Sequence, residues 1–379
     1  MIKNFAASHR KSVAEVLDYF SGNMRWQSLF EDLHHRKSAT IDGARGSSIS
    51  LVLSVLEQHC PGTLIVVNAY ANDLDFLRSD GETLGISKST IFPAWDSWPL
   101  KRRDHLDAVA AQRLQVIQQI MEQESGVVYT TMTALMQPVP AKVDFLRDRL
   151  KLTVGETIDL DYLMRWLVDH GYQRTDAVEH PGDWSKRGEI IEVYSLDRLF
   201  PIRMVLFDDQ IESIRSIHLE TKRSDLSFQE TWLMAIPIIA EKRPGRGTDS
   251  GGIYRGHLCD YLSDDSWTVL IKIPELQDQA KRYFEEMEEP VGLFTHEAVF
   301  QKLTQFANVS LSDLSTVSNE TAIHLACDRL GKFGCEAERL RAEIDRIAPV
   351  AQLFIACQNQ IEQTRIQELL AGSVVQKIP

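Results

Sequence analysis

Short apolar runs alternate with amphipathic segments along the first 140 residues of the chain. The runs at residues 63–67 (TLIVV) and 126–131 (GVVYTT) are typical of strands buried on both faces of a parallel sheet. Apolar residues at helical spacing predict helices over residues 8–37, 49–56, 72–84 and 107–123. Two prolines in residues 91–99 exclude a helix and predict an extended segment. Strands that alternate with helices in this way predict an α/β domain with a parallel sheet.

The pattern changes after Pro138 and Pro140, which interrupt either kind of element and mark a boundary. Beyond them, strands are predicted over residues 156–160, 172–178, 186–194 and 202–217, the last of which is broken by a turn at Asp208-Asp209. Asp159 or Asp161 is expected to cap a helix that runs to His170, with Gly171 after its end. This part is expected to form a small α+β insert.

The remainder of the chain returns to the first pattern. We expect a loop at residues 241–252, a buried strand at 266–271, helices at 276–287, 295–306 and 319–348, and a strand–helix unit at 353–357 and 360–370. The sequence ends at Pro379, soon after that single unit. We therefore expect a fragment of a longer protein.

The composition is that of a folded, acidic protein. Hydrophobic residues make up 44% of the 379 residues, and 41 Lys and Arg against 54 Asp and Glu give a net charge of −13. Nucleic acid repels such a charge at long range, so DNA binding is not the expected function. Five cysteines without a C-x-x-C pair indicate reduced thiols, and no apolar run is long enough for a signal peptide or a transmembrane helix. We expect a cytoplasmic protein without membrane contact.

A glycine-rich segment at residues 43–50 (GARGSSIS) is a degenerate form of the phosphate-binding loop, G-x-x-x-x-G-K-[ST]. Gly43 fits the first glycine and Ser50 fits the hydroxyl residue. Ser48 stands where the second glycine is expected, and Ile49 replaces the lysine. The lysine holds the β and γ phosphates, and isoleucine carries no charge. The segment therefore favours binding over catalysis.

The glycine-rich segment at residues 43–50 has two further features and a simpler alternative interpretation. Gly46 supplies a further glycine within the segment, and Arg45 could contact an anion at a helix N-terminus. The alternative is that residues 43–50 are only a turn before a helix, because an isolated motif of this kind is a weak signal.

The order of the features resembles the N-terminal region of the bacterial transcription-repair coupling factors, whose domains are similar to those of the excinuclease UvrB. The resemblance rests on FPAWDSWP (92–99), AQRL (111–114), GVVYTTMTALMQPVP (126–140), LVDHGYQRTDAVEHPGDWSKRGEIIEVYS (167–195) and RMVLFDDQIESIRSIH (203–218). Residues 43–218 are covered well, residues 257–275 more thinly, and residues beyond 320 least.

The resemblance implies an architecture. A degenerate helicase-like domain of the P-loop NTPase type is expected from two chain segments, residues 1–138 and 230–318. Residues 139–229 form the α+β insert between them. Residues 319–379 are expected to begin a further α/β domain, which is incomplete.

The resemblance also places a second degenerate motif. Residues 267–271 occupy the position of the strand that carries the acidic pair for Mg²⁺ and water in the excinuclease UvrB. Here the strand is followed by Lys272-Ile273-Pro274-Glu275, and a lysine with an apolar residue cannot hold a metal. We expect no cofactor, no metal and no ATPase activity in this chain. ATP-dependent DNA translocation in the family belongs to regions outside these residues.

In the family, the insert is the docking surface for the excinuclease UvrA. Arg174 in YQR, Arg187 in KRG and Tyr194 in IEVYS match the contact motif, although the family has Phe-Pro where this chain has Tyr194-Ser195. Arginine can bind a carboxylate with two parallel hydrogen bonds, and an aromatic ring can anchor the contact. The alternative is that both arginines are ordinary exposed strand residues and that Tyr194 packs in the core.

We therefore expect a non-catalytic module that recruits the excinuclease UvrA in transcription-coupled nucleotide excision repair. RNA polymerase and DNA are expected to be contacted only by family regions outside this chain. The alternatives are a divergent helicase-like ATPase acting on DNA and an unrelated α/β interaction protein. Of the other candidates, His34-His35 lacks metal-ligand spacing, and Phe92, Trp95 and Trp98 are expected to pack rather than to stack on a base.

Overall fold

The computed structural model describes residues 17–96, 108–122, 126–147, 149–221, 223–235, 254–287, 290, 292–313, 321–325, 341–342, 345 and 360–369. Residues 8–16 of the first predicted helix, Trp98, the loop at 241–252, the strand at 353–357 and three cysteines (Cys327, Cys335, Cys357) lie outside them. The chain divides into two units, residues 1–325 and 326–379. In the second unit, α12 (Gln360–Leu369) confirms the predicted helix.

The first unit contains a seven-stranded sheet in which every neighbouring pair is parallel. Its strands are β1 (Ser38–Asp42), β2 (Leu64–Asn68), β3 (Ser89–Phe92), β4 (Val127–Thr131), β15 (Trp267–Ile271), β16 (Ala307–Ser312) and β17 (Thr321–His324). The order is β17-β1-β16-β15-β2-β4-β3, so β15 and β16 lie between two strands from the early part of the chain. The predicted parallel α/β sheet is confirmed, and distant chain segments build it together.

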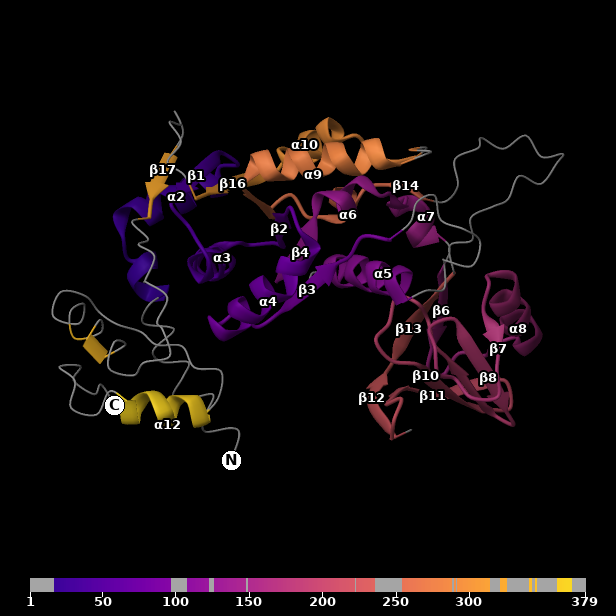
Figure 1. Ribbon diagram of the computed structural model, residues 1–379. Coiled ribbons are helices and arrows are strands. Elements are labelled where there is room, and N and C mark those ends of the chain that lie inside the picture. Colours follow the sequence, from indigo (N-terminus) through magenta and orange to yellow (C-terminus); the bar gives the residue numbers. More distant parts are fainter. Residues whose placement is uncertain are drawn as a thin grey trace. The chain divides into compact units, whose positions relative to one another are not determined.

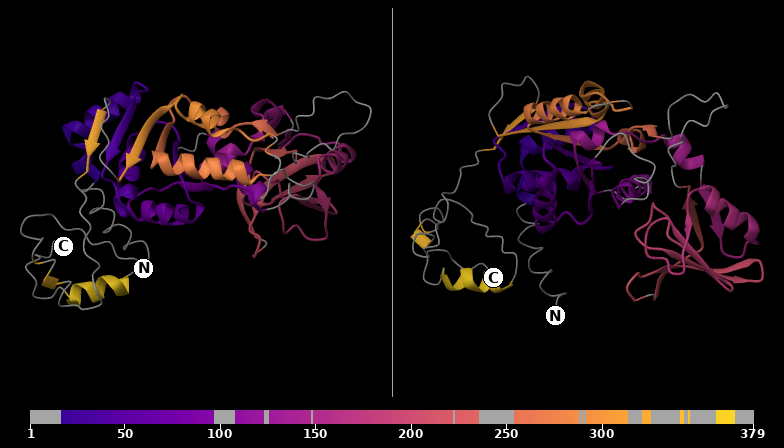
Figure 2. Two further views of the ribbon diagram at one scale, coloured as in Figure 1. Left: turned by 45° about the horizontal axis from the view of Figure 1, so that its top comes forward. Right: turned by 45° about the vertical axis from the view of Figure 1, so that its right-hand side comes forward.

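Helices cover both faces of this sheet. In Figures 1 and 2, α3 (Ser47–His59) and α4 (Leu74–Thr83) lie on one face, and α9 (Ile273–Glu286) and α10 (His296–Leu303) lie on the other. The central strand β2 is buried along its whole length: Leu64 and Val66 belong to one core cluster, and Ile65 and Val67 belong to the second. Successive side chains of a strand point to opposite faces, which explains why this run is continuously apolar. Within the described residues, no helix is long and apolar enough to span a bilayer.

The remaining elements of the α/β part flank the sheet. They are α2 (Met24–His34), α5 (Ala108–Met121), α6 (Met132–Met136), α7 (Lys142–Arg147) and a short pair formed by β5 (Val139–Pro140) and β14 (Tyr254–Gly256). Arg113 on α5 is buried, with its guanidinium 4.1 Å from the ring centre of Phe92 and 4.0 Å from that of Trp95. Both rings are thus core residues, and the expected packing role is confirmed for them.

A separate mixed sheet of six strands forms the insert. The strands are β7 (Gln173–Arg174), β8 (Asp183–Arg187), β9 (Ile190–Val193), β10 (Ile202–Phe207), β11 (Gln210–Ile217) and β12 (Ser224–Phe228), in the order β12-β11-β10-β9-β8-β7. Helix α8 (Leu160–Asp169) begins at Asp159, whose Oδ1 accepts a hydrogen bond from the Tyr162 N–H. Gly171 follows the helix with a φ of 88°. The predicted cap and end of this helix are confirmed, as is the β10–β11 hairpin.

Several predicted elements differ from the structure. The strand predicted at residues 186–194 spans the end of β8, a turn and β9, and the strand predicted at 172–178 contains only the two residues of β7. The strand predicted at residues 156–160 is wrong: the strand here is β6 (Arg149–Thr153), which pairs with β13 (Glu230–Met234), and residue 157 makes only an isolated bridge to Gln210. Residues 321–324 of the helix predicted at 319–348 form β17. The helix predicted to reach residue 37 ends at His34, and β1 and β16 were not predicted at all.

Candidate functional site

The glycine loop connects the carboxyl end of β1 to the N-terminus of α3. Gly43 follows Asp42 with a φ of 83°, and Gly46 precedes the helix with a φ of 53°. A phosphate-binding loop has this strand–loop–helix context. Ile49, at the lysine position, packs against the core cluster on its face of the sheet. The loop has the position of a phosphate cradle without the charge.

The polar groups of the loop bind other protein groups. The Arg45 guanidinium donates to the Asp313 carbonyl at 2.7 Å, and Ser47 Oγ donates to Asp80 Oδ2 at 2.8 Å. Ser48 Oγ exchanges hydrogen bonds with the backbone of Arg45. Each of these side chains at the start of α3 therefore has a protein partner.

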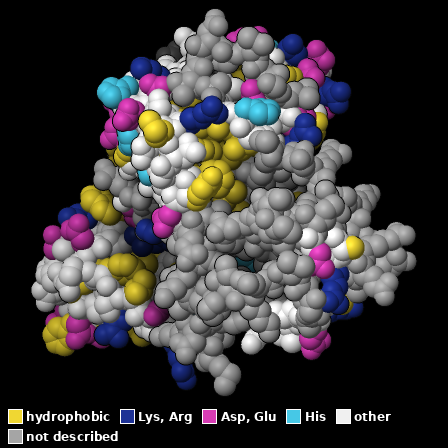
Figure 3. Space-filling view, turned by 90° about the vertical axis from the view of Figure 1, so that its left-hand side faces the viewer, with side chains coloured by type: hydrophobic (Ala, Val, Ile, Leu, Met, Phe, Trp, Pro, Cys, Tyr) yellow, Lys and Arg dark blue, Asp and Glu magenta, His cyan; other side chains and the backbone are white. Residues whose placement is uncertain are grey.

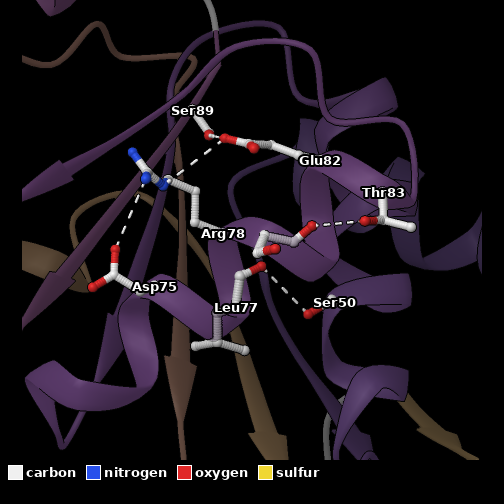
Figure 4. A network of polar contacts seen from close by, with 8 residues as sticks. Ser50, Asp75, Leu77, Arg78, Glu82, Thr83 and Ser89 are labelled. Atoms are coloured by element: carbon white, nitrogen blue, oxygen red, sulfur yellow. Dashed lines mark hydrogen bonds and ion pairs between the residues drawn. The ribbon is translucent and has the colours of Figure 1, made fainter. Parts of the chain in front are cut away.

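Ser50, which fits the hydroxyl position of the motif, is fully buried and lies against α4. Its Oγ donates to the Leu77 carbonyl at 3.5 Å, as Figure 4 shows beside the exposed contacts of Arg78 with Asp75 and Glu82. The hydroxyl is directed to the neighbouring helix and serves packing between α3 and α4.

Lys272 follows β15 and precedes α9 in the left-handed conformation, with a φ of 54°. Its Nζ lies 3.1 Å from Glu275 and 3.7 Å from the Asp313 carboxylate. Partial burial lowers the pKa of Lys272, but the hydrogen bond and negative charge of Glu275 outweigh burial, so that the pKa is raised overall. The only acidic residue predicted in this motif is thus paired with a lysine.

Asp313 joins the two degenerate motifs. It follows β16, which lies between β1 and β15, and it binds Arg45 through its carbonyl and Lys272 through its carboxylate. The structure therefore brings the glycine loop and the segment at Lys272 together at the carboxyl ends of the parallel strands. In the part of the chain that the structure describes, no three His, Cys, Asp or Glu residues are grouped closely enough to hold a metal ion.

The two predicted interface arginines lie on different faces of the insert sheet. Arg174 pairs with Trp184, and its guanidinium lies 5.6 Å from the centre of that ring. Arg187 is three residues after Trp184 in β8, so it points to the opposite face. Its guanidinium donates to the Asp176 carbonyl, which ties the end of β8 to the segment after β7.

One face of the insert sheet is covered and the other is exposed. Trp184, Ile191 and Met204 are buried in the cluster that includes Leu163 and Leu167 of α8. The opposite face carries, side by side across three strands, Arg187, Ile190 and Val205. We call this the exposed sheet face; it also includes Phe207 and the ion pair of Glu192 with Arg203 at 2.6 Å.

The apolar part of the exposed sheet face was not predicted from the sequence. Ile190 is 39% exposed and Phe207 is 67% exposed. The alternation of residues 202–207 contained a signal, because buried Met204 and Leu206 place Phe207 on the outside. An exposed aromatic beside an arginine is typical of protein-binding surfaces.

Tyr194, by contrast, is a core residue. Only 6% of it is exposed, its hydroxyl donates to the Leu199 carbonyl at 2.9 Å, and burial raises the pKa of the phenol. Its position agrees with the alternative that it packs in the core.

Other candidate groups have ordinary roles. His34 and His35 are exposed. Cys60 and Cys259 are free thiols, and burial raises the pKa of each to about 12, so that both stay protonated at neutral pH. Figure 3 shows charges of both signs interspersed over the described side chains on the side of α2 and β17, without a basic patch for nucleic acid.

Comparison with known proteins gives a family match that coincides with the insert. The family model of the UvrB interaction domain matches residues 150–236. The chain is 31% identical over 207 residues to the transcription-repair-coupling factor of Bacillus subtilis strain 168, which covers 52% of this chain and 17% of the relative. Over 218 residues it is 26% identical to that of Staphylococcus haemolyticus, covering 57% and 18%.

A third relative, the transcription-repair-coupling factor of Staphylococcus aureus strain RF122, is 32% identical over 120 residues, or 32% of this chain and 10% of the relative. The aligned part is thus less than a fifth of the length of each of these relatives. Over about half of its residues, the chain is a homologue of the N-terminal region of the transcription-repair-coupling factors, and it contains a UvrB interaction domain.

Proposed function

We propose that this chain recruits the excinuclease UvrA in transcription-coupled nucleotide excision repair, and that it does so through the exposed sheet face of the insert. The observation that carries the proposal is the coincidence of two features. Residues 150–236 match the UvrB interaction domain, and the sheet in that range leaves part of one face exposed, at Arg187, Ile190 and Phe207. A repair-complex docking domain needs such a free face.

The chemistry of the face supports a protein partner. Arg187 offers a planar guanidinium at the edge of an apolar strip formed by Ile190, Val205 and Phe207. An arginine next to partly exposed apolar residues is suited to a carboxylate that lies beside an apolar pocket on the partner. Arg174, over the ring of Trp184 on the other face, is proposed as a secondary contact at the edge.

The same proposal assigns no ATP chemistry to the α/β part. Its support is the uncharged side chain of Ile49, which packs against the core cluster, and the pairing of Lys272 with Glu275 and Asp313. The helicase-like segments at 1–138 and 230–318 would then act as a scaffold for the insert at 139–229, in the cytoplasm. RNA polymerase and DNA would be bound by parts of the longer family proteins.

Substitution of Arg187 tests the proposed docking. Arg187→Glu reverses the charge on the exposed sheet face and should weaken binding to the excinuclease UvrA by at least about tenfold, since hot-spot arginines contribute about 2 kcal/mol or more. Isothermal titration calorimetry with the whole chain measures the change. Unchanged affinity would refute the assignment of this face.

Arg165→Glu is the matched control for this experiment. Arg165 is exposed on α8, which covers the other side of the same sheet, and the substitution changes the net charge equally. We expect its affinity to stay within about twofold of the unsubstituted chain. An equal loss in both variants would mean that net charge, rather than the exposed sheet face, determines binding.

The alternative function is a divergent helicase-like ATPase acting on DNA. The strand–loop–helix context of residues 43–50 is the observation in its favour. Detectable ATP turnover that disappears in Ser50→Ala would support the alternative. Absence of turnover in both chains is the outcome that our proposal predicts.

A further inference from the structure

The glycine loop lies against the last residues of the first unit. β17 pairs in parallel with β1, with His324 opposite Asp42, and the N–H of the next residue, Leu325, donates to the Asp42 carbonyl at 2.8 Å. We call residues 321–325 the strap. It extends the sheet along β1 and ends directly over the start of the glycine loop.

Gly43 is the residue that makes this contact possible. A Cβ at this position would lie 2.1 Å from the carbonyl oxygen of Leu325 and 3.2 Å from its carbonyl carbon. Both are backbone atoms, so they cannot rotate away as a side chain could. The φ of 83° at Gly43 is a second reason why a side chain is disfavoured here.

Gly46, in the same loop, provides a comparison. Its φ of 53° is also in the left-handed region, but a Cβ there would meet no atom within 4 Å. Both glycines serve the path of the loop, whereas only Gly43 is required for close approach of another segment. That segment is the chain's own backbone.

We propose that the degenerate loop is the docking site of the strap, and that the strap is a latch that can open. Leu325 occupies the space over Gly43 with a carbonyl oxygen, whose negative potential would repel an anion at the same place. The second unit begins at Ala326, so the strap is the last part of the chain anchored to the sheet before that unit. Release of its five residues adds about 17 Å of extended chain between the sheet and Ala326. It also leaves the edge of β1 unpaired.

The latch depends on few backbone contacts. Among the described strands only β1 pairs with the strap, through four register pairs and the Leu325 hydrogen bond, whereas α2 and the buried side chain of Ile323 add packing. Edge elements with few pairing partners open at lower cost than central strands. The strap is therefore expected to open while the centre of the sheet stays closed.

Hydrogen exchange with mass spectrometry, on the whole chain, tests the latch. Gly43→Ala should accelerate exchange of the strap amides by about tenfold or more while β2 and β15 keep their protection, because the clash acts on Leu325 alone. Gly46→Ala, which also places a side chain at a positive φ but without the clash, should leave the strap unchanged. Unaltered exchange in Gly43→Ala, or equal acceleration in both variants, would overturn the proposal.

Leu325→Pro gives an independent result if Gly43→Ala fails to fold. It removes the N–H that donates to Asp42 and leaves the glycine loop intact. The strap should again exchange faster while the central strands remain protected. Full protection of the strap in this variant would also overturn the latch. None of these readouts depends on the excinuclease UvrA, so the latch can fail while the proposed docking stands.

Discussion

His257 is a buried histidine whose ring contributes to the packing of the α/β part. It is fully buried, its Nδ1 accepts a hydrogen bond from the Cys259 N–H at 3.1 Å, and Phe294 packs edge-on against it. Burial, with a smaller contribution from the positive charge of Lys302, lowers the pKa of this imidazole to about 4. The neutral ring is therefore part of the folded structure.

This burial predicts a pH dependence of stability. The unfolded chain binds a proton at His257 below its ordinary pKa of 6.5, whereas the folded chain does not until about 4. The free energy of unfolding should then fall as the pH drops from 6.5 to 4, by up to about 1.4 kcal/mol per pH unit from this residue. Urea unfolding measured across this window checks the slope.

His257→Asn is the control for the pH prediction. Asparagine can accept the Cys259 hydrogen bond through its side-chain oxygen but does not titrate. The variant should show a shallower slope between pH 6.5 and 4 than the unsubstituted chain. Identical slopes would show that other groups, such as His59, whose pKa is also lowered by burial, account for the acid sensitivity.

At the scale of elements, the approach of α4 to β4 depends on Gly81. A Cβ at this position in the last turn of α4 would lie 2.6 Å from the Tyr129 hydroxyl and 2.8 Å from Ile86 Cδ1. Gly81→Ala should lower the free energy of unfolding by about 1–3 kcal/mol, because the clash outweighs the gain of about 1 kcal/mol in helix propensity. Urea unfolding of the whole chain measures this difference.

Tyr129→Phe completes the experiment as a double-mutant cycle. The Tyr129 hydroxyl is buried and has no hydrogen-bond partner among the described residues, so its removal should cost little. In the Gly81→Ala background it should recover part of the lost stability, since the nearest clashing atom is gone. If Gly81→Ala is as stable as the unsubstituted chain, helix α4 can shift away from β4 and the packing argument is wrong.

Local signals predicted the strands with continuous apolar runs well and the strands with interspersed polar residues poorly. β2 and β4 are buried on both faces, so their residues form continuous apolar runs that identify them. β1 (SATID) is short and contains two polar residues besides its terminal aspartate, and its partner β16 lies about 270 residues away in the chain. Pairing between strands so far apart in the chain gives no signal in the local sequence. The strand status of residues 321–324 likewise depends on β1.

In the candidate sites, too, features of the local sequence could be predicted and contacts between distant residues could not. The context of the glycine loop and the departures at Ile49 and Lys272 could be inferred from residues and from the resemblance. The partners that the structure gives to Arg45 and Lys272, both through Asp313, could not, because Asp313 comes from a strand that was not predicted. In the insert, alternation could place Arg187 on a face, but the burial of Tyr194 required the three-dimensional packing.

At the scale of the whole molecule, the order of the strands joins chain segments that the insert separates in sequence. β15 and β16 lie between β1 and β2, so residues on both sides of the insert are needed for one sheet. Experiments on docking therefore use the whole chain, in which the insert is held by its natural flanks.

Hydroxyl-radical footprinting in the presence and absence of the excinuclease UvrA tests the central claim most directly, because it reports the exposure of individual side chains. Phe207, on the exposed sheet face, and Tyr162, on α8, are both open to solvent in the chain alone, at 67% and 49%. Docking through the exposed sheet face predicts that oxidation of Phe207 falls strongly on complex formation while that of Tyr162 stays the same. Protection of Tyr162 with unchanged oxidation of Phe207 would contradict the account.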